Sequence, residues 1–420
     1  MFFLKILWLC NTLIPELAEK LSIKNTKPES WITGIYNKIK KEDINLVYLF
    51  PVEEGNLEIS IDKSVFVSYV QKNSVKFEKE QITAFEKIIN DKKPDVIHIF
   101  GTEFPHTFAM IKAAENKGML DKTIINIQGL VSVYAKHFYA SLDNKTVRAY
   151  TFRDFVKRNN IHNQRLAFVK RGIYEEKALR LSRHVIGRTD WDKACVTRVN
   201  HDINYHFCNE TLRKPFYENS WDIEKCEKHS IFVSQSNYPI KGFHYMLEAM
   251  ADIVKIYPDA HLYTTGNSPL NLNFNQKIRQ GYYSKYLGKL IKKYNLENNV
   301  TFLGYLDEDK MCERFLKSNV FVCCSSIENS PNSVGEAMIL GVPVVTSDMC
   351  GVKNMLPHEK EGFVYQADAP YMLSYYIKKI FENRDIALKF SENAKQHAKE
   401  THNEDKNFKG LIKIYKEIMK

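Results

Sequence analysis

Short apolar segments alternate with longer amphipathic ones along this chain, and the alternation constrains the fold more than any other feature. In the first half, segments with helical spacing at 78–91 and 108–118 separate short apolar runs. Those runs lie at 46–50, 95–100 and 123–127. Because strand–helix–strand repeats build a parallel sheet covered by helices on both faces, we expect a doubly wound α/β domain.

The same alternation restarts after an irregular stretch at 207–228. A chain of 420 residues also exceeds the size that a single core usually reaches, about 250–300 residues. We therefore expect two Rossmann-like domains that face a central cleft, with boundaries at 1–215 and 216–403. The last segment, 404–420, is predicted to be a helix that packs back towards the first domain.

The N-terminal segment MFFLKILWLCNTLIPEL is apolar, but it is predicted to be a first buried strand near residue 6 rather than a secretion signal. Lys5 and Asn11 interrupt the apolar run, and no small-residue cleavage site follows. The sequence contains no uninterrupted apolar stretch of about 18 residues, so we expect no transmembrane helix. The expected location is the cytoplasm, either in solution or at the inner face of the membrane.

The net charge limits the classes of partner, and the cysteine content limits the kinds of site and the compartment. A formal net charge of +10 favours anionic partners such as nucleotide diphosphates or anionic lipid surfaces. The basic residues alternate with Asp and Glu and no nucleic-acid recognition motif occurs, so no nucleic-acid partner is expected. The eight cysteines form no CxxC pair, which argues against a zinc or thioredoxin-like site and fits a reducing compartment.

The densest polar motif is SSIENSPNSVGEAMILGVPVV, which begins at Ser325 and follows a buried strand. It is typical of a loop, a helix and a further strand, and backbone N–H groups at a helix start can bind a phosphate. The residues at that start are Asn332, Ser333 and Val334. Glu328 and Glu336 flank them, and carboxylates accept hydrogen bonds from vicinal hydroxyls. The motif therefore predicts a site for an anion held between polyols.

This motif resembles the E-x7-E signature of retaining GT-B glycosyltransferases of family four, the glycosyl transferases group 1 type. The resemblance covers most of the second half and extends more weakly to DVIHIF and GRTDWD. It implies a GT-B fold in which the first domain binds the acceptor and the second binds a nucleotide sugar. In that family the first Glu contacts the transferred sugar and the second contacts the nucleotide ribose. Those roles fall to Glu328 and Glu336.

A second segment, SIFVSQSNYPIKGFHYMLEAM, resembles the strand, basic loop and helix of the same family. The family's lysine neutralises the donor diphosphate, and Lys241 matches it. The family's arginine early in this loop is replaced by Gln235, which can hydrogen-bond to a phosphate but cannot neutralise it. Either Arg188 or another basic residue compensates, or the donor is handled differently.

Residues of the first half offer weaker candidates for chemistry. His106 follows the apolar run at 95–100, and it either faces the cleft or begins a helix with no chemical role. Gln128 stands where many family members carry a histidine that touches the sugar, and it can bind a hydroxyl but cannot act as a base. The resemblance implies a reaction in which the leaving phosphate helps to deprotonate the acceptor, without a metal. His98, inside the apolar run, is expected to be a core residue.

The sequence as a whole predicts a metal-independent, retaining glycosyltransferase. We expect a UDP-sugar rather than a GDP-sugar donor and a saccharide or lipid-linked acceptor, in cell-surface or capsular polysaccharide synthesis. Basic segments with the aromatic residues Tyr150, Phe152 and Phe155 suggest peripheral contact with an anionic membrane. The alternatives are a nucleotide-sugar epimerase, a sugar phosphorylase, and a weakly active nucleotide-sugar-binding subunit.

Overall fold

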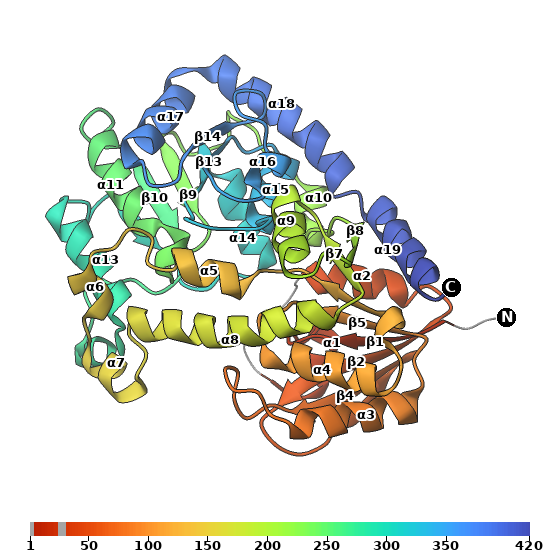
Figure 1. Cartoon of the computed structure of the whole chain (residues 1–420). Helices are drawn as coiled ribbons and strands as arrows, with labels where there is room; N and C mark the ends of the chain where they lie inside the picture. The colour runs from red at the N-terminus through yellow and green to blue at the C-terminus, as the bar shows by residue number, and fades with distance from the viewer. Residues whose placement is uncertain (1–3, 24–30) are drawn as a thin grey trace. The chain divides into compact units, whose positions relative to one another are not determined.

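A computed structural model describes residues 4–23 and 31–420 and divides the chain into two compact units. Unit 1 comprises Met1–Ala135, Ala167–Arg213 and His402–Lys420. Unit 2 comprises Lys136–Leu166 and Lys214–Thr401. The chain thus passes from one unit to the other at four places, and each unit contains its own parallel sheet (Figure 1).

Unit 1 is built on an eight-stranded sheet in the order β3-β4-β2-β1-β5-β6-β7-β8. Its strands are β1 (Leu4–Leu9), β2 (Ile44–Val52), β3 (Glu58–Ile61), β4 (Ser64–Val70), β5 (Val96–Phe100), β6 (Thr123–Asn126), β7 (His184–Gly187) and β8 (Asn204–Phe207). All neighbouring pairs are parallel except β3 and β4, which form an antiparallel edge. The sheet confirms the predicted doubly wound architecture.

The alternating side chains of β1 show how the sheet is buried on both faces. Ile6 and Trp8 join a core that includes Tyr415, whereas Leu7 and Leu9 join a separate core on the other face. Helices α2 (Trp31–Ile39) and α19 (Glu404–Ile418) complete the first core, together with the short α1 (Pro15–Lys20). Helices α3 (Glu80–Lys92), α4 (Pro105–Asn116), α8 (Ile161–Leu181) and α9 (Asp190–Val199) complete the second (Figure 1). A one-turn 3-10 helix, η1 (Leu120–Lys122), precedes β6.

Residues 136–166 correct the predicted domain boundaries, because they belong to unit 2 although they lie inside the predicted first domain. They contain the end of α5 (Val131–His137), α6 (Asn144–Arg148), α7 (Phe152–Lys157) and the start of α8. His244 Nε2 lies 2.9 Å from the carbonyl oxygen of Ala140, and the N–H of Tyr282 donates to Asp154 Oδ2 at 2.7 Å. These contacts fix residues 136–166 to helices of unit 2. They join residues that are far apart in the sequence, so no local sequence pattern predicts them.

Unit 2 has a fully parallel six-stranded sheet in the order β11-β10-β9-β12-β13-β14. Its strands are β9 (Ser230–Val233), β10 (His261–Thr264), β11 (Val300–Phe302), β12 (Val320–Cys323), β13 (Val344–Asp348) and β14 (Phe363–Gln366). The central strands β9 and β12 are buried along their whole length, as expected for a sheet covered on both faces. The division at Lys214 lies two residues before the predicted boundary at 216.

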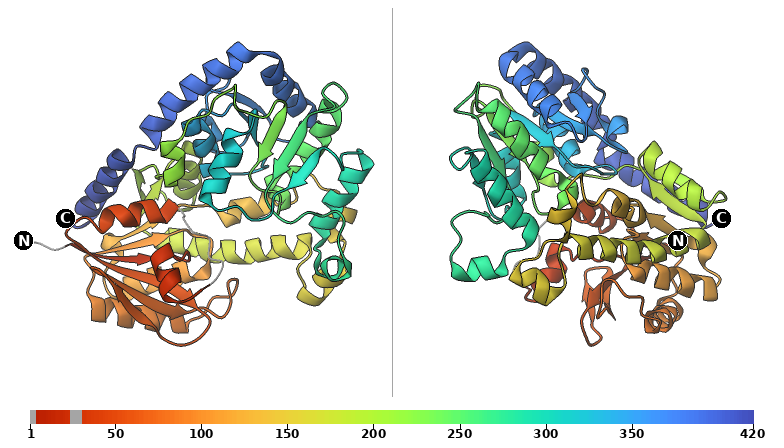
Figure 2. Two further views of the ribbon diagram at one scale, coloured as in Figure 1. Left: turned by 180° about the vertical axis from the view of Figure 1, so that it is seen from behind. Right: turned by 60° about the vertical axis from the view of Figure 1, so that its left-hand side comes forward.

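The helices of unit 2 alternate with its strands. They are α10 (Lys214–Glu218), η2 (Pro239–Lys241), α11 (Phe243–Ile253), α12 (Phe274–Arg279), α13 (Tyr282–Lys293), α14 (Glu308–Leu316), α15 (Asn332–Leu340), α16 (Val352–Met355), α17 (Pro370–Glu382) and α18 (Arg384–Thr401). The long α17 and α18 stand out in blue in Figure 2. No helix within residues 4–23 and 31–420 combines the length and the apolar character needed to cross a bilayer.

Candidate functional site

Two loops that follow neighbouring strands of unit 2 bring Lys241 and Glu328 together. Lys241 ends the 3-10 helix after β9, and Glu328 lies in the loop after β12. The Lys241 ammonium forms an ion pair with the Glu328 carboxylate, and Ser325 Oγ donates to the same carboxylate oxygen at 3.1 Å. Ligands of open α/β sheets bind at the carboxyl ends of strands, which is where this pair is placed.

Gly242 explains how the two loops can approach so closely. Its φ is +68°, and a Cβ built there would lie 1.8 Å from the carbonyl oxygen of Cys324. Any other residue would have to displace the loop after β12 and would also carry the strain of a left-handed backbone. Lys241 therefore supplies the charge of the ion pair, and Gly242 leaves the space that the loop after β12 needs to approach it.

The environment of Lys241 keeps its side chain charged. Burial lowers the pKa of the ammonium, but the neighbouring Glu328 carboxylate raises it, and the net pKa lies above the ordinary value. Lys241 therefore remains a cation throughout the physiological pH range. Its positive charge is balanced by Glu328, so an incoming anion would compete with that carboxylate for it.

Helix α15 begins beside this pair in sequence and carries the predicted anion-binding residues. Asn332 and Ser333 form its first turn, and no side chain caps the helix start at Pro331. The backbone N–H of Val334 donates to the carbonyl oxygen of Pro331 at 2.9 Å, so the prediction that Val334 offers an open N–H is wrong. A tight 3-10-type first turn takes up this donor. The predicted anion-binding N–H groups are thereby reduced to those of Asn332 and Ser333.

Two further predicted residues of unit 2 differ in accessibility. Glu336 lies in the second turn of α15 and is only 4% exposed. Gln235 lies exposed in the loop that follows β9. Gln235 is therefore accessible from solvent, whereas the carboxylate of Glu336 is covered by its surroundings.

Arg188 and Gln128 meet in a buried network of unit 1 that centres on Glu210. Arg188 Nη1 pairs with Glu210 Oε2 at 2.6 Å, and Arg188 Nη2 donates to the carbonyl oxygen of Ile127 at 3.2 Å. Gln128 Nε2 donates to the other oxygen of Glu210 and to Asn126 Oδ1. Arg188 is one of the alternatives for the missing loop arginine, and its charge is paired with Glu210 within unit 1. Glu210 itself carries no sequence signal that distinguishes it from a surface carboxylate.

His106 is the second residue of α4, and it is buried next to an open pocket. Its Nδ1 lies 3.2 Å from both Tyr69 Oη and Gln71 Oε1, and burial lowers its pKa to about 3. Gln71 in turn lines a cavity of about 320 Å³ in unit 1. The neutral His106 ring thus contacts the Gln71 side chain, and Gln71 rather than His106 lines the pocket.

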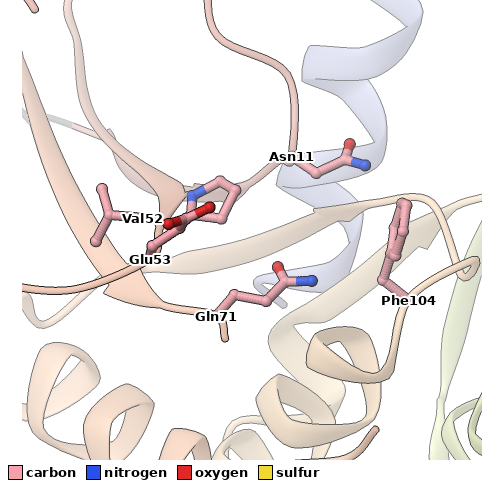
Figure 3. A pocket seen from close by; sticks show the side chains of 6 residues that line it. Asn11, Val52, Glu53, Gln71 and Phe104 are labelled. Atoms are coloured by element: carbon pink, nitrogen blue, oxygen red, sulfur yellow. The ribbon is translucent and has the colours of Figure 1, made fainter. Parts of the chain in front are cut away.

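The pocket lies where several strands of the first sheet end. Its walls are formed by Asn11, Pro51, Val52, Glu53, Gln71 and Phe104. Figure 3 shows Asn11, Gln71 and Phe104 around one opening, with Val52 and Glu53 on its other side. Amide and carboxylate groups beside an aromatic ring suit a polyol that offers hydroxyls and an apolar ring face. The sequence motifs singled out none of these wall residues.

Two carboxyl groups of unit 1, Glu103 in the loop after β5 and Glu175 in α8, lie near each other. Glu175 is buried and accepts hydrogen bonds from the N–H groups of Val131 and Ser132, each at 2.9 Å, and from Thr102 Oγ1 at 2.7 Å. Burial raises its pKa to about 7 despite these bonds. Burial and the nearby Glu175 also raise the pKa of Glu103 to about 7. Both groups therefore change protonation near neutral pH.

Three further ring-bearing side chains, His98, Trp191 and His137, differ in their surroundings. His98 is fully buried, its Nδ1 contacts Tyr415 Oη at 2.5 Å, and burial lowers its pKa to about 3, which confirms the expected core role. Trp191 stacks on Tyr134 with ring centroids 6.1 Å apart. His137 is exposed at the end of α5.

The sequence of the second half of the chain is similar to that of known proteins. Residues 214–397 match the family model described as glycosyl transferases group 1. YtcC of Bacillus subtilis strain 168 is 25% identical over 205 residues, which cover 48% of this chain and 48% of that protein. The match thus spans about half the length of this chain and about half the length of YtcC.

Two solved structures match nearly the whole chain. Sucrose-phosphate synthase from Thermosynechococcus elongatus superposes with a TM-score of 0.71 at 14% identity and covers 99% of each chain. HepE from Anabaena, in complex with UDP and glucose, gives a TM-score of 0.67 at 16% identity and covers 98% of this chain and 99% of its own. The chain therefore has the two-domain α/β fold of these proteins, and its residues 214–397 resemble the group 1 glycosyl transferases.

Proposed function

We propose that this protein is a retaining glycosyltransferase that moves a sugar from a UDP-sugar donor to a saccharide or lipid-linked saccharide acceptor. A role in cell-surface or capsular polysaccharide synthesis suits such a reaction. The observation that supports the proposal most is the Lys241–Glu328 pair within the segment that matches group 1 glycosyltransferases. HepE shares the fold and binds UDP and glucose, which favours a UDP-sugar over a GDP-sugar donor.

Donor binding is proposed to exchange partners within the pair. The diphosphate takes the place of Glu328 at the Lys241 ammonium and receives further hydrogen bonds from the start of α15 and from Gln235. Glu328, released from the lysine, accepts hydrogen bonds from hydroxyls of the sugar. Glu336 moves enough to accept bonds from the ribose. The negative charge that builds up on the departing UDP is then stabilised by Lys241.

The transfer itself forms one bond and breaks one. The acceptor hydroxyl oxygen bonds to the anomeric carbon on the face from which UDP departs, and the bond from that carbon to the β-phosphate oxygen breaks. The hydroxyl proton passes to a phosphate oxygen of the leaving UDP. This scheme needs no protein base, which agrees with a neutral Gln128 and a His106 whose pKa is lowered to about 3.

The acceptor is proposed to bind in the pocket of unit 1. Phe104 offers an aromatic face for a sugar ring, while Asn11, Glu53 and Gln71 offer hydrogen-bonding groups. We also propose that transfer requires no metal, since a lysine and a helix start supply the charge and dipoles that a diphosphate requires. All eight cysteines are free thiols, which supports a cytoplasmic site of action.

Turnover assays with purified protein test the proposal. Release of UDP from a panel of UDP-sugars is measured with EDTA present and with the variants Lys241→Met and Glu328→Gln. Each substitution is expected to lower kcat/KM by on the order of 100-fold, because Lys241 stabilises the charge on the departing UDP and Glu328 binds hydroxyls of the transferred sugar. Glu248→Gln, an exposed residue of α11, is the matched control and should leave turnover unchanged. Wild-type turnover in both site variants would rule out the proposed roles.

Analysis of products separates this function from its rivals. A transferase forms a glycoside only when acceptor is added, whereas an epimerase converts the nucleotide sugar without acceptor, and a phosphorylase needs phosphate. Gln235 replaces the family's arginine, and Arg188 is already paired with Glu210. These two features favour a nucleotide-sugar-binding subunit as the second candidate. That candidate predicts a thermal shift with UDP-sugars but no hydrolysis or transfer, even after long incubation.

A further inference from the structure

One surface of unit 2 combines exposed apolar side chains with uncompensated positive charge. It is formed by residues 144–158 and 269–293, and we name it the α7–α12 surface. Helices α7 and α12 pack against each other, and Figure 2 shows α7 in dark yellow beside the teal segment that contains α12 in both views. The hydrogen bond from the N–H of Tyr282 to Asp154 fixes α7 to the start of α13.

Large apolar side chains of both helices point to solvent. Phe152, Phe155 and Val156 of α7 are 67%, 74% and 63% exposed, and Phe274 of α12 is 77% exposed. Tyr150 and Ile278 extend the same set. Single exposed apolar residues are normal on protein surfaces, but a cluster on two packed helices marks an interaction site.

The positive charge of the chain is concentrated in the same two segments. Residues 144–158 contain five lysines and arginines and one carboxylate, and residues 269–293 contain six and no carboxylate. Their combined net charge equals the whole chain's net of +10, so the remainder of the chain is neutral overall. The one carboxylate, Asp154, is buried and paired with Arg153 at 3.1 Å. It therefore offsets one of these eleven positive charges, that of Arg153.

Part of this charge lines a cavity. A pocket of about 330 Å³ lies between α13 and the segment that leads through α12, and its walls contain no carboxylate. Four lysines contribute to those walls: Lys277, Lys285, Lys289 and Lys292. A pocket of this kind suits a phosphate group, and it is formed by the same helix that exposes Phe274.

We propose that the α7–α12 surface docks the protein on an anionic phospholipid bilayer. The aromatic side chains enter the interface between headgroups and acyl chains, and the lysines bind headgroup phosphates. The aliphatic Val156 and Ile278 favour a lipid occupant over a nucleic acid, since aliphatic side chains gain from an apolar interior but cannot stack on bases. This docking goes beyond the proposed sugar transfer and does not depend on it.

Vesicle flotation tests the docking directly. The full-length protein should float with phosphatidylcholine vesicles that contain phosphatidylglycerol, but not with pure phosphatidylcholine vesicles, and high salt should release it. The variant Phe152→Ser/Phe155→Ser/Phe274→Ser should bind anionic vesicles at least about tenfold more weakly. The variant Lys277→Gln/Lys285→Gln/Lys289→Gln should bind on the order of 100-fold more weakly, because each basic side chain near the surface contributes a factor of about five.

Matched controls replace aromatic residues of similar exposure elsewhere. Phe207 of unit 1 and Tyr371 of unit 2 are each 64% exposed, and Phe207→Ser/Tyr371→Ser should bind vesicles as the wild type does. Thermal melting of every variant checks that the fold is kept. Equal binding to neutral and anionic vesicles, or wild-type binding by the aromatic variant, would overturn the proposal. So would tight binding of single-stranded RNA through the same residues together with no vesicle binding.

Discussion

Glu175 shows how burial of a single side chain makes the stability of unit 1 sensitive to pH. The carboxyl is held by two backbone N–H groups and a threonine hydroxyl, and its pKa is about 7, above its ordinary value of 4.5. Between these two pKa values the folded protein holds a proton that the unfolded chain releases. The contribution of this carboxyl to the free energy of unfolding is therefore greatest below about pH 4.5, and it is lost as the pH rises through 7.

Replacing Glu175 by Gln should flatten this dependence. The wild-type free energy of unfolding is expected to fall by on the order of 1–3 kcal/mol more than that of Glu175→Gln between pH 5 and pH 8. Denaturant unfolding of both proteins at several pH values measures the difference. Glu176→Gln, the neighbouring and more exposed residue of α8, is the control, and parallel pH curves for Glu175→Gln and wild type would contradict the prediction.

Single residues also mark the limit of what the sequence could reveal about the site. The spacing of Glu328 and Glu336 and the match of Lys241 identified the candidates, because those residues belong to a local strand–loop–helix pattern. Their pairing was not predictable, since Lys241 and Glu328 are 87 positions apart and meet only when β9 and β12 become neighbours. Glu210 was missed for a similar reason, because only the folded sheet brings it to Arg188.

At the scale of elements, the approach of two loops at Gly242 can be tested with a matched glycine. Gly304 has a similar φ of +72°, but nothing lies within 4 Å of the Cβ position, whereas Gly242 faces the carbonyl oxygen of Cys324. Gly304→Ala should cost about 1 kcal/mol for the left-handed backbone alone. Gly242→Ala should cost more and should also weaken nucleotide binding, because it displaces the loop that carries Glu328.

Thermal melting with and without UDP measures both effects. The melting temperature without nucleotide reports the cost of each substitution, and the shift on adding UDP reports binding. A full UDP-induced shift in Gly242→Ala would show that the loop position does not matter for the nucleotide.

Strands buried on both faces were the elements that the sequence predicted best. The apolar run at 46–50 lies within β2, the run at 95–100 contains β5, and the segment SIFVSQSNYPIKGFHYMLEAM begins with β9. The antiparallel edge formed by β3 and β4 was missed, because β3 is half-buried and its polar and apolar residues form too short a pattern. Edge strands depend on their neighbours more than on their own composition.

At the scale of the whole molecule, α19 ties the end of the chain to the core of unit 1. Leu411, Ile414, Tyr415 and Ile418 are buried there. Burial of each such side chain stabilises by about 1.5–3 kcal/mol, and a domain has about 5–15 kcal/mol in total. A chain ending at Thr401 should therefore lose the melting transition of unit 1 while unit 2 still unfolds cooperatively.

Differential scanning calorimetry, with UDP added to identify the transition of unit 2, tests this expectation. Lys413→Ala/Lys416→Ala changes two exposed residues of the same helix and should preserve both transitions. If the chain ending at Thr401 melts as the full-length protein does, α19 is dispensable for unit 1.

The fourfold passage of the chain between the units also sets an order for its biosynthesis. Unit 2 is complete once Thr401 has left the ribosome, before α19 of unit 1 is made. The core of unit 1 that contains Trp8 and Tyr415 therefore lacks α19 until all of unit 2 has been synthesised. During synthesis, chaperones meet an incomplete unit 1 for longer than an incomplete unit 2.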